Sequence, residues 1–270
     1  MGNAIVLSRS IAYAAHSRHR LDICRPVGAA AAPVVIFFYG GAWRSGNKGL
    51  YRYVAKALAR RGYVAIVPDY RIYPEVRYPE FLEDGAQVVR WVKDNIAGFG
   101  GDPRKVFLKG HSAGAHIAAM LAIDARWLRN LGLDPGRDIA GLIGLAGPYD
   151  YLPLRDETLK VIFGGADRPE TQPIHHVVPG APPALLLTGD RDRLVEPGNS
   201  MRLAARLVAA GNAATVKTYR RVGHYIVVAA IAPILSEFIP VLRDVDAFIV
   251  ATLQAPRQAP TVTAPALAPV

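Results

Sequence analysis

The sequence predicts an α/β protein with a mainly parallel central sheet and helices on both faces of that sheet. Two observations carry this prediction. Short apolar runs alternate with longer segments in which apolar residues recur at helical spacing. Several of the short runs are followed closely by Gly or Pro, as is typical where a strand gives way to a loop. Strands separated by helices need crossover connections, and such connections place neighbouring strands in parallel.

In chain order, the apolar runs predict strands at 33–38, 64–67, 106–108, 139–145, 184–187 and 215–219. The helical patterns predict helices at 48–61, from residue 79 onward, and at 113–122, 199–210 and 236–252. Gly62 is a suitable stop for the first of these helices, because Gly readily adopts the left-handed conformation found at helix ends. The stretch 147–183 is the longest irregular segment, which is typical of a variable region over a site.

The domain organisation is expected to be simple. The chain has 270 residues, 51% of them hydrophobic and 20% charged, which excludes a wholly disordered protein. No internal repeat or break in composition divides it, so residues 1–253 are predicted to form one domain. Residues 254–270 are rich in Ala and Pro and are expected to form a disordered tail.

The formal net charge of +10 is the unusual number, but the basic residues are scattered along helices rather than gathered in a block. Solvated helix faces explain this better than a nucleic-acid partner, which is therefore not expected. The single cysteine, Cys24, excludes an internal disulfide and a cysteine-based metal cluster. The apolar run 226–235 is too short to span a bilayer, and no signal peptide is recognisable, so a cytoplasmic location is expected.

The motif Gly110-His111-Ser112-Ala113-Gly114 fits G-x-S-x-G and lies between a predicted strand and a predicted helix. That context is typical of a nucleophile elbow, a strained turn that exposes a serine hydroxyl at the edge of a sheet. An ordinary strand-to-helix turn is the less favoured explanation. Ser112 is therefore the candidate nucleophile.

A serine nucleophile needs a histidine to take its proton and a carboxylate to orient that histidine, and in this arrangement they follow in the order Ser, acid, His. His224 comes just after the last predicted strand, and it alone among the histidines satisfies the positional rule. Asp190 and Asp192 both follow the strand 184–187, with Glu196 as an outside candidate, and spacing does not choose between them.

Backbone donors for an oxyanion are expected from Ala113 and from the loop that follows the first strand, Tyr39-Gly40-Gly41-Ala42-Trp43. Four aromatic residues lie in loops expected near the site, and they either line a substrate pocket or pack the loops: Trp43, Tyr73, Tyr149 and Tyr151. No phosphate-binding loop occurs in the sequence, and no metal or cofactor is expected.

With these motifs in view, the chain resembles α/β-hydrolase carboxylesterases close to the hormone-sensitive-lipase-like and bacterial feruloyl-esterase-like families, and it is also similar to kynurenine formamidase. Besides the elbow and His224, the resemblance rests on the segments 38–43, 68–71, 73–75, 101–103 and 146–150. It implies an α/β-hydrolase fold without a large lid. It also implies Ser112 as nucleophile, His224 as base and Asp192 as acid, since the acid of these families ends a G-x-x-D motif. Gly41, Ala42 and Ala113 would then form the oxyanion hole.

One position departs from the pattern of these families. Their oxyanion motif begins His-Gly-Gly, and here Tyr39 stands in place of the histidine that normally braces the loop. The expected activity is hydrolysis of small carboxylic esters through an acyl-enzyme. Two alternatives stay open: an amidohydrolase of the kynurenine-formamidase type, and a non-catalytic, ligand-binding homologue. The sequence also leaves a homo-oligomer open.

Overall fold

The computed structural model describes residues 4–255, and within them the chain forms one eight-stranded sheet with the strand order β1-β2-β4-β3-β5-β6-β7-β8. The strands are β1 (Ile5–Ala12), β2 (Arg20–Pro26), β3 (Ala32–Phe38), β4 (Val64–Pro68), β5 (Gly101–His111), β6 (Gly141–Leu145), β7 (Ala184–Gly189) and β8 (Ala214–Tyr219). All pairings from β4 to β8 across the sheet are parallel, whereas β1 pairs antiparallel with β2, and β2 with β4. The predicted α/β class with a mainly parallel sheet is confirmed.

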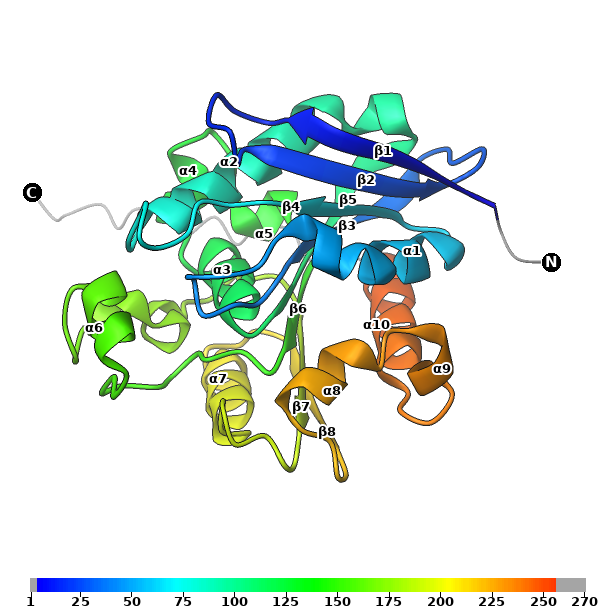
Figure 1. Cartoon of the computed structure of the whole chain (residues 1–270). Helices are drawn as coiled ribbons and strands as arrows, with labels where there is room; N and C mark the ends of the chain where they lie inside the picture. Colours follow the sequence, from blue (N-terminus) through cyan, green and yellow to red (C-terminus); the bar gives the residue numbers. More distant parts are fainter. Residues whose placement is uncertain (1–3, 256–270) are drawn as a thin grey trace, which may run out of the picture.

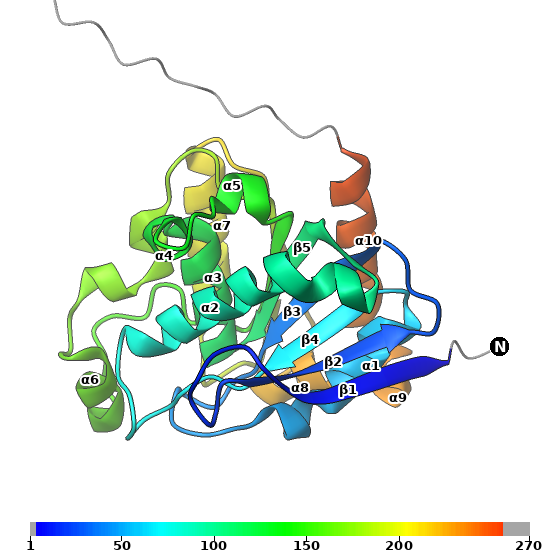
Figure 2. The ribbon, with the colours of Figure 1, turned by 90° about the horizontal axis from the view of Figure 1, so that it is seen from above.

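Helices cover both faces of the sheet, with α1 and α10 on one face and α2, α3 and α7 on the other (Figures 1 and 2). The α-helices are α1 (Arg52–Arg60), α2 (Glu80–Asn95), α3 (Ala113–Ile123), α4 (Arg126–Arg129), α5 (Pro135–Asp138), α6 (Glu157–Phe163), α7 (Gly198–Ala209), α8 (His224–Ala229), α9 (Pro233–Ser236) and α10 (Val241–Gln254). Short 3₁₀ turns are η1 (Lys48–Tyr51), η2 (Ile96–Phe99), η3 (Pro169–Thr171) and η4 (Pro173–His176). Strands β3, β4, β6 and β7 are almost wholly apolar on both faces because both faces are covered. Strand β5 also carries charged residues, among them the buried Lys109.

Besides the short helices α4, α5 and α8, which were not predicted, the structure differs from the sequence expectations in three places. The hairpin of β1 and β2 was not predicted. The stretch 147–183, expected to be irregular, contains α6 and two 3₁₀ turns. The last helix, expected at 236–252, begins only at Val241, because Pro240 lacks an amide hydrogen and its ring clashes with a preceding helical turn. Ser236 instead ends the separate short helix α9.

The chain ends bear on two further predictions. Gln254 still belongs to α10, and residues 256–270 of the predicted tail lie outside the described residues. The single domain over 1–253 and the cytoplasmic location stay predictions. Between residues 4 and 255, no helix combines the length and the apolar character needed to cross a membrane.

The carboxyl ends of the parallel strands lie at one edge of the sheet, and the loops that leave this edge carry all the residues singled out as candidates. Loop 39–47 follows β3, and Ser112 follows β5. Asp192 and His224 follow β7 and β8. The crevice outside the carboxyl ends of the strands is where open α/β sheets place their ligands.

Candidate active site

Ser112 occupies a sharp turn between β5 and α3, with φ of 53° and ψ of −122°. The backbone of a residue other than glycine is strained in this conformation, and such strain persists only where the surrounding structure imposes it. The flanking glycines make the turn sterically possible: a Cβ atom on Gly110 would lie 2.1 Å from the carbonyl oxygen of Gly114, and one on Gly114 would lie 2.1 Å from that of Phe38. The local sequence therefore forms the elbow geometry that G-x-S-x-G predicts.

The side chains of Ser112, His224 and Asp192 form a continuous hydrogen-bonded chain. His224 Nε2 lies 2.9 Å from Ser112 Oγ, and His224 Nδ1 lies 2.7 Å from Asp192 Oδ2. An ionised carboxylate only accepts hydrogen bonds, so Nδ1 carries the ring proton and the lone pair of Nε2 faces the serine hydroxyl. This is the tautomer that a general base requires.

Asp192 is held as a carboxylate. Burial on its own would raise its pKa, but hydrogen bonds from His224 and from the amides of Val195 and Leu194 outweigh burial and hold the pKa below the ordinary value. Asp190, the competing aspartate, is exposed and accepts a hydrogen bond from the amide of Arg221 instead. Of the three acidic candidates, Asp192 is the one that contacts His224.

The loops that carry the acid and the base are joined by main-chain hydrogen bonds. The amide of Asp190 donates to the carbonyl of Tyr219 at 3.0 Å, and the amide of Arg191 donates to the carbonyl of Val222, also at 3.0 Å. Gly189 permits this approach, because a Cβ atom there would lie 2.1 Å from the Val222 carbonyl oxygen. The separation of acid and base is thus set largely by the backbone.

Two histidines near Ser112 are buried and hydrogen-bonded to carbonyls. His111 Nε2 donates to the carbonyl of His224 at 3.0 Å, and its ring packs 4.8 Å from that of His224. Burial, reinforced by the nearby His224, lowers the pKa of His111 to about 3. His116 Nε2 donates to the carbonyl of Thr171 at 2.7 Å, and burial lowers the pKa of His116 to about 4. Both rings are therefore neutral at physiological pH. The hydrogen bond from His111 to the backbone of His224 could not be predicted from the spacing of the motifs.

The glycine loop after β3 lies against the serine. A Cβ atom on Gly40 would lie 3.0 Å from Ser112 Cβ. The loop then turns back on itself, because the carbonyl of Gly41 accepts from the amides of Arg44 and Ser45 at 3.1 and 3.0 Å. The amide of Ala113, the first residue of α3, has no carbonyl partner within its own helix. The loop 39–43 and Ala113, whose amides were predicted to bind an oxyanion, therefore both lie next to Ser112.

The four aromatic candidates do not form one group. Trp43 packs parallel to Tyr151, with ring centroids 6.2 Å apart, and edge-on to Phe163 of α6 at 4.8 Å. Tyr73 is half-buried, and its amide donates to the carbonyl of Trp43 at 2.8 Å.

Tyr149 occupies a different place. It is fully buried, and a Cβ atom on Gly144 of β6 would lie 1.9 Å from the Tyr149 hydroxyl oxygen. Tyr149 thus packs against β6, and its place in the substrate pocket stays a prediction.

Fold and site geometry together define the class: the protein is an α/β-hydrolase with a serine–histidine–aspartate constellation at the carboxyl edge of its sheet. Residues 21–207 match the family model BD-FAE, and the chain belongs to this family. Residues 164–254, which include His224, also match the model of the prolyl oligopeptidase family.

Curated relatives carry esterase names. The probable isoprenylcysteine alpha-carbonyl methylesterase ICMEL1 of Oryza sativa subsp. japonica is 43% identical over 112 residues, which are 41% of this chain and 26% of that protein. Esterase LipC of Mycobacterium tuberculosis is 30% identical over 221 residues, covering 74% of this chain and 55% of that protein. The chain thus spans from about a quarter to about half of the length of these relatives.

Solved structures share the whole architecture. The apo form of Thermogutta terrifontis esterase 2 superposes with a TM-score of 0.76 at 25% identity, covering 94% of this chain and 97% of that one. A truncated carbohydrate esterase from gut microbiota gives a TM-score of 0.81 at 20% identity, covering 94% and 98%. The second likeness speaks for the fold alone.

Proposed function

We propose that the protein is a serine carboxylesterase that hydrolyses small, short-chain carboxylic esters through an acyl-enzyme. The observation that carries the proposal is the hydrogen-bonded chain from Asp192 through His224 to Ser112, at 2.7 and 2.9 Å, on a nucleophile elbow. The esterase names of its relatives support the same class of reaction.

Each group then has one role. His224 Nε2 takes the proton of Ser112 Oγ as this oxygen attacks the ester carbonyl, and Asp192 stabilises the imidazolium that forms. The amides of Gly41, Ala42 and Ala113 donate to the oxyanion of the tetrahedral intermediate. When the intermediate collapses, the alcohol leaves with the proton from His224. A water molecule deprotonated by the same histidine then attacks the acyl-enzyme, and the acid is released.

The expected preference for short acyl groups follows from the aromatic side chains beside the oxyanion loop. Trp43 belongs to this loop, and its ring is packed against Tyr151, His116 and Phe163. Rings packed in this way fill space that a long acyl chain would need, and rearranging them would expose apolar surface. We therefore expect kcat/KM to fall from acetate and butyrate to octanoate.

The first test compares p-nitrophenyl acetate hydrolysis by the unaltered protein, Ser112→Ala and Ser236→Ala. Loss of the nucleophile should lower kcat/KM by at least about 10³-fold. Ser236→Ala is the matched control, because its hydroxyl donates only to the carbonyl of Pro233. Equal rates for Ser112→Ala and the unaltered protein would contradict the mechanism and favour a non-catalytic homologue.

The second test ranks kcat/KM over p-nitrophenyl acetate, butyrate and octanoate, a feruloyl ester and N-formylkynurenine. A maximum at acetate or butyrate supports the proposal. Preference for octanoate would contradict the short-chain assignment, and preference for N-formylkynurenine would replace the esterase by an amidohydrolase.

A further inference from the structure

Tyr39 begins the glycine loop, and its ring is fixed on three sides. It stacks between Tyr70, with ring centroids 4.8 Å apart, and Tyr51, at 5.5 Å. The far end of the loop returns over the same ring, because a Cβ atom on Gly46 would lie 2.9 Å from the Tyr39 ring. The main chain of Tyr39 is also tied, since its carbonyl accepts from the Tyr70 hydroxyl at 2.7 Å.

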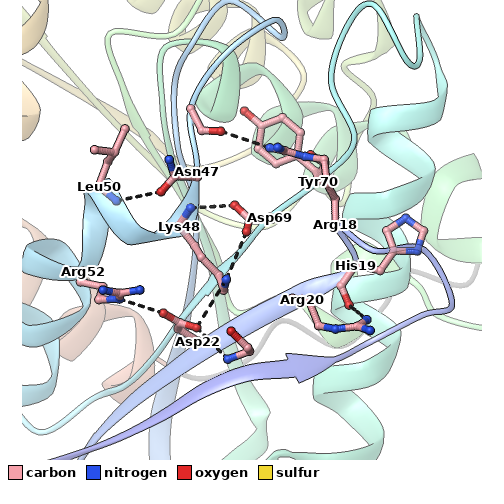
Figure 3. Close-up of polar contacts among 12 residues, drawn as sticks. Arg18, His19, Arg20, Asp22, Asn47, Lys48, Leu50, Arg52, Asp69 and Tyr70 are labelled. Carbon is pink, nitrogen blue, oxygen red and sulfur yellow. Dashed lines mark hydrogen bonds and ion pairs between the residues drawn. The ribbon is translucent and has the colours of Figure 1, made fainter.

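One carboxylate oxygen holds both ends of this loop. Asp69 Oδ1 accepts from the Tyr39 hydroxyl at 2.9 Å and from the amide of Lys48 at 2.7 Å. Tyr39 precedes the loop segment 40–47, and Lys48 follows it. The second oxygen, Oδ2, pairs with Lys48 Nζ at 3.2 Å (Figure 3). Asp69 itself is nearly buried and directly follows β4, so its position is set by the sheet.

Arg18, from the connection between β1 and β2, contributes a further tie. One of its terminal nitrogens donates to the Tyr39 hydroxyl at 3.0 Å and to the carbonyl of Gly46 at 3.1 Å, while its Nε donates to the carbonyl of Tyr70 at 2.9 Å. Figure 3 shows Arg18 beside Tyr70, with its bond to the loop. The guanidinium of Arg18 thus contacts Tyr39 at the start of the loop, Gly46 near its end, and Tyr70, which lies just after β4.

The hydroxyl of Tyr39 both donates and accepts a hydrogen bond. Burial, and to a lesser extent the charge of Asp69, raises the pKa of Tyr39 well above its ordinary value, so the hydroxyl keeps its proton. It donates this proton to Asp69 while it accepts from Arg18. The role that these contacts give to the group is therefore geometric.

The backbone of the loop needs such ties. Ala42 and Trp43 adopt φ of 50° and 56°, and Gly41 adopts φ of 140°. Residues with a Cβ atom disfavour positive φ, so this conformation persists only when the surrounding structure imposes it. The amides of Gly41 and Ala42, which would hold the oxyanion, lie within this strained stretch.

We propose that Asp69, Tyr39 and Arg18 are positioning residues that fix the oxyanion loop, with Asp69 Oδ1 as the point where both loop ends meet. This inference rests on the proposed function, in which the Gly41 and Ala42 amides stabilise the oxyanion. The three side chains touch no reacting atom and act through the direction of those amides. The hydroxyl of Tyr39 supplies the brace at the position where the resembling families have a histidine.

The test is Tyr39→Phe, which removes the hydroxyl and keeps the stacked ring. Its matched control is Tyr63→Phe, because Tyr63 is also a nearly buried tyrosine whose hydroxyl bonds an aspartate, Asp246. Complete loss of one oxyanion donor costs about 10²–10³ in turnover, so misdirected donors should cost kcat about tenfold, with KM changed less than about twofold. Tyr63→Phe should keep the kcat of the unaltered protein.

Amide hydrogen exchange supplies a second readout that needs no activity. Peptides covering residues 40–48 should exchange faster in Tyr39→Phe, while Tyr63→Phe leaves them unchanged. Arg18→Met should act in the same direction, and its effect should not add fully to that of Tyr39→Phe because both act on one loop.

The outcomes separate the two proposals. Faster exchange in a protein that hydrolyses no ester would reject the esterase function and keep the assignment of the brace. An active Tyr39→Phe protein with unchanged kcat and unchanged exchange would overturn the inference. It would also be overturned if Tyr63→Phe lowered kcat by the same factor, since the effect would then be one of general stability.

Discussion

The two sides of the candidate site are held by different kinds of bond. On one side, the loops that carry Asp192 and His224 are joined main chain to main chain through Asp190 and Arg191. On the other side, the two ends of the proposed oxyanion loop donate hydrogen bonds to, or accept them from, side chains from distant parts of the chain, above all Asp69. The acid–base side is therefore defined by the sheet, and the oxyanion side by particular residues.

This difference teaches where each side is vulnerable. Main-chain hydrogen bonds survive most substitutions, and they break only where a new side chain pushes apart the loops after β7 and β8. A side-chain brace is lost by a single substitution that leaves every strand in place. Activity and stability should therefore respond separately on the oxyanion side and together on the acid–base side.

The largest expected effect tests the acid–base side. Asp192→Asn should lower kcat/KM by about 10³–10⁴-fold, because the amide no longer stabilises the charged ring and admits the wrong tautomer of His224. Asp190→Asn keeps the oxygen that accepts from the amide of Arg221 and should change kcat/KM less than about threefold. Steady-state kinetics on one ester checks both variants. A larger loss at Asp190 would assign the acid to that residue.

A pair of glycine substitutions sharpens the comparison directly. In Gly41→Ala the new Cβ would lie 2.1 Å from the carbonyl oxygen of Ser45, and in Gly189→Ala it would lie 2.1 Å from that of Val222. Gly41→Ala should lower kcat by about 10²-fold with little change in Tm, because it displaces oxyanion donors in a surface loop. Gly189→Ala should lower kcat and Tm together, because it separates two sheet-borne loops.

Gly62→Ala is the control for this pair. Gly62 also has a positive φ, 95°, but a Cβ atom there would meet nothing within 4 Å. It should cost about 1 kcal/mol in the free energy of unfolding and leave kcat unchanged. A Gly41→Ala protein that behaves like Gly62→Ala would show that the oxyanion loop tolerates displacement.

The last prediction concerns acid stability. Burial lowers the pKa of His116 to about 4, so between about pH 6.5 and pH 4 the unfolded chain binds a proton that the folded protein does not. The free energy of unfolding therefore falls as pH falls through this range, by up to about 1.4 kcal/mol per pH unit for one such histidine. His116→Gln should reduce the slope by about that amount in urea unfolding at several pH values. An unchanged slope would show that folding does not lower the pKa of His116.

The sequence predicted the parts of the molecule that depend on local patterns. The apolar runs identified β3, β4, β6 and β7, because strands covered on both faces are apolar almost throughout. In β5 and β8 only part of the strand is apolar, and that part was enough to place each strand. The elbow was readable because its glycines and serine are consecutive in the chain. Asp192 was preferred only through the resemblance, and the contact with His224 stays the reason to test it.

The parts that escaped prediction depend on partners far away in the chain. Strand β1 was missed because exposed polar residues such as Arg9 and Ser10 break the apolar pattern at the edge of the sheet. The brace around Tyr39 was missed because its members are 21 and 30 residues from Tyr39, at Arg18 and Asp69. Spacing alone carries no signal for such contacts, although the replacement of a bracing histidine by Tyr39 marked the position.

The antiparallel hairpin of β1 and β2 has a consequence for where a working unit can be cut. Its connection carries Arg18, which ties the oxyanion loop, and His224 lies near the other end of the fold. Both residues fall outside the stretch 21–207 that defines the family by similarity. Fragments, fusions or circular permutants trimmed to residues 21–207 would keep Ser112 and lose both His224 and Arg18. Boundaries for engineering should follow the hydrogen bonds that reach the serine, not the extent of the match.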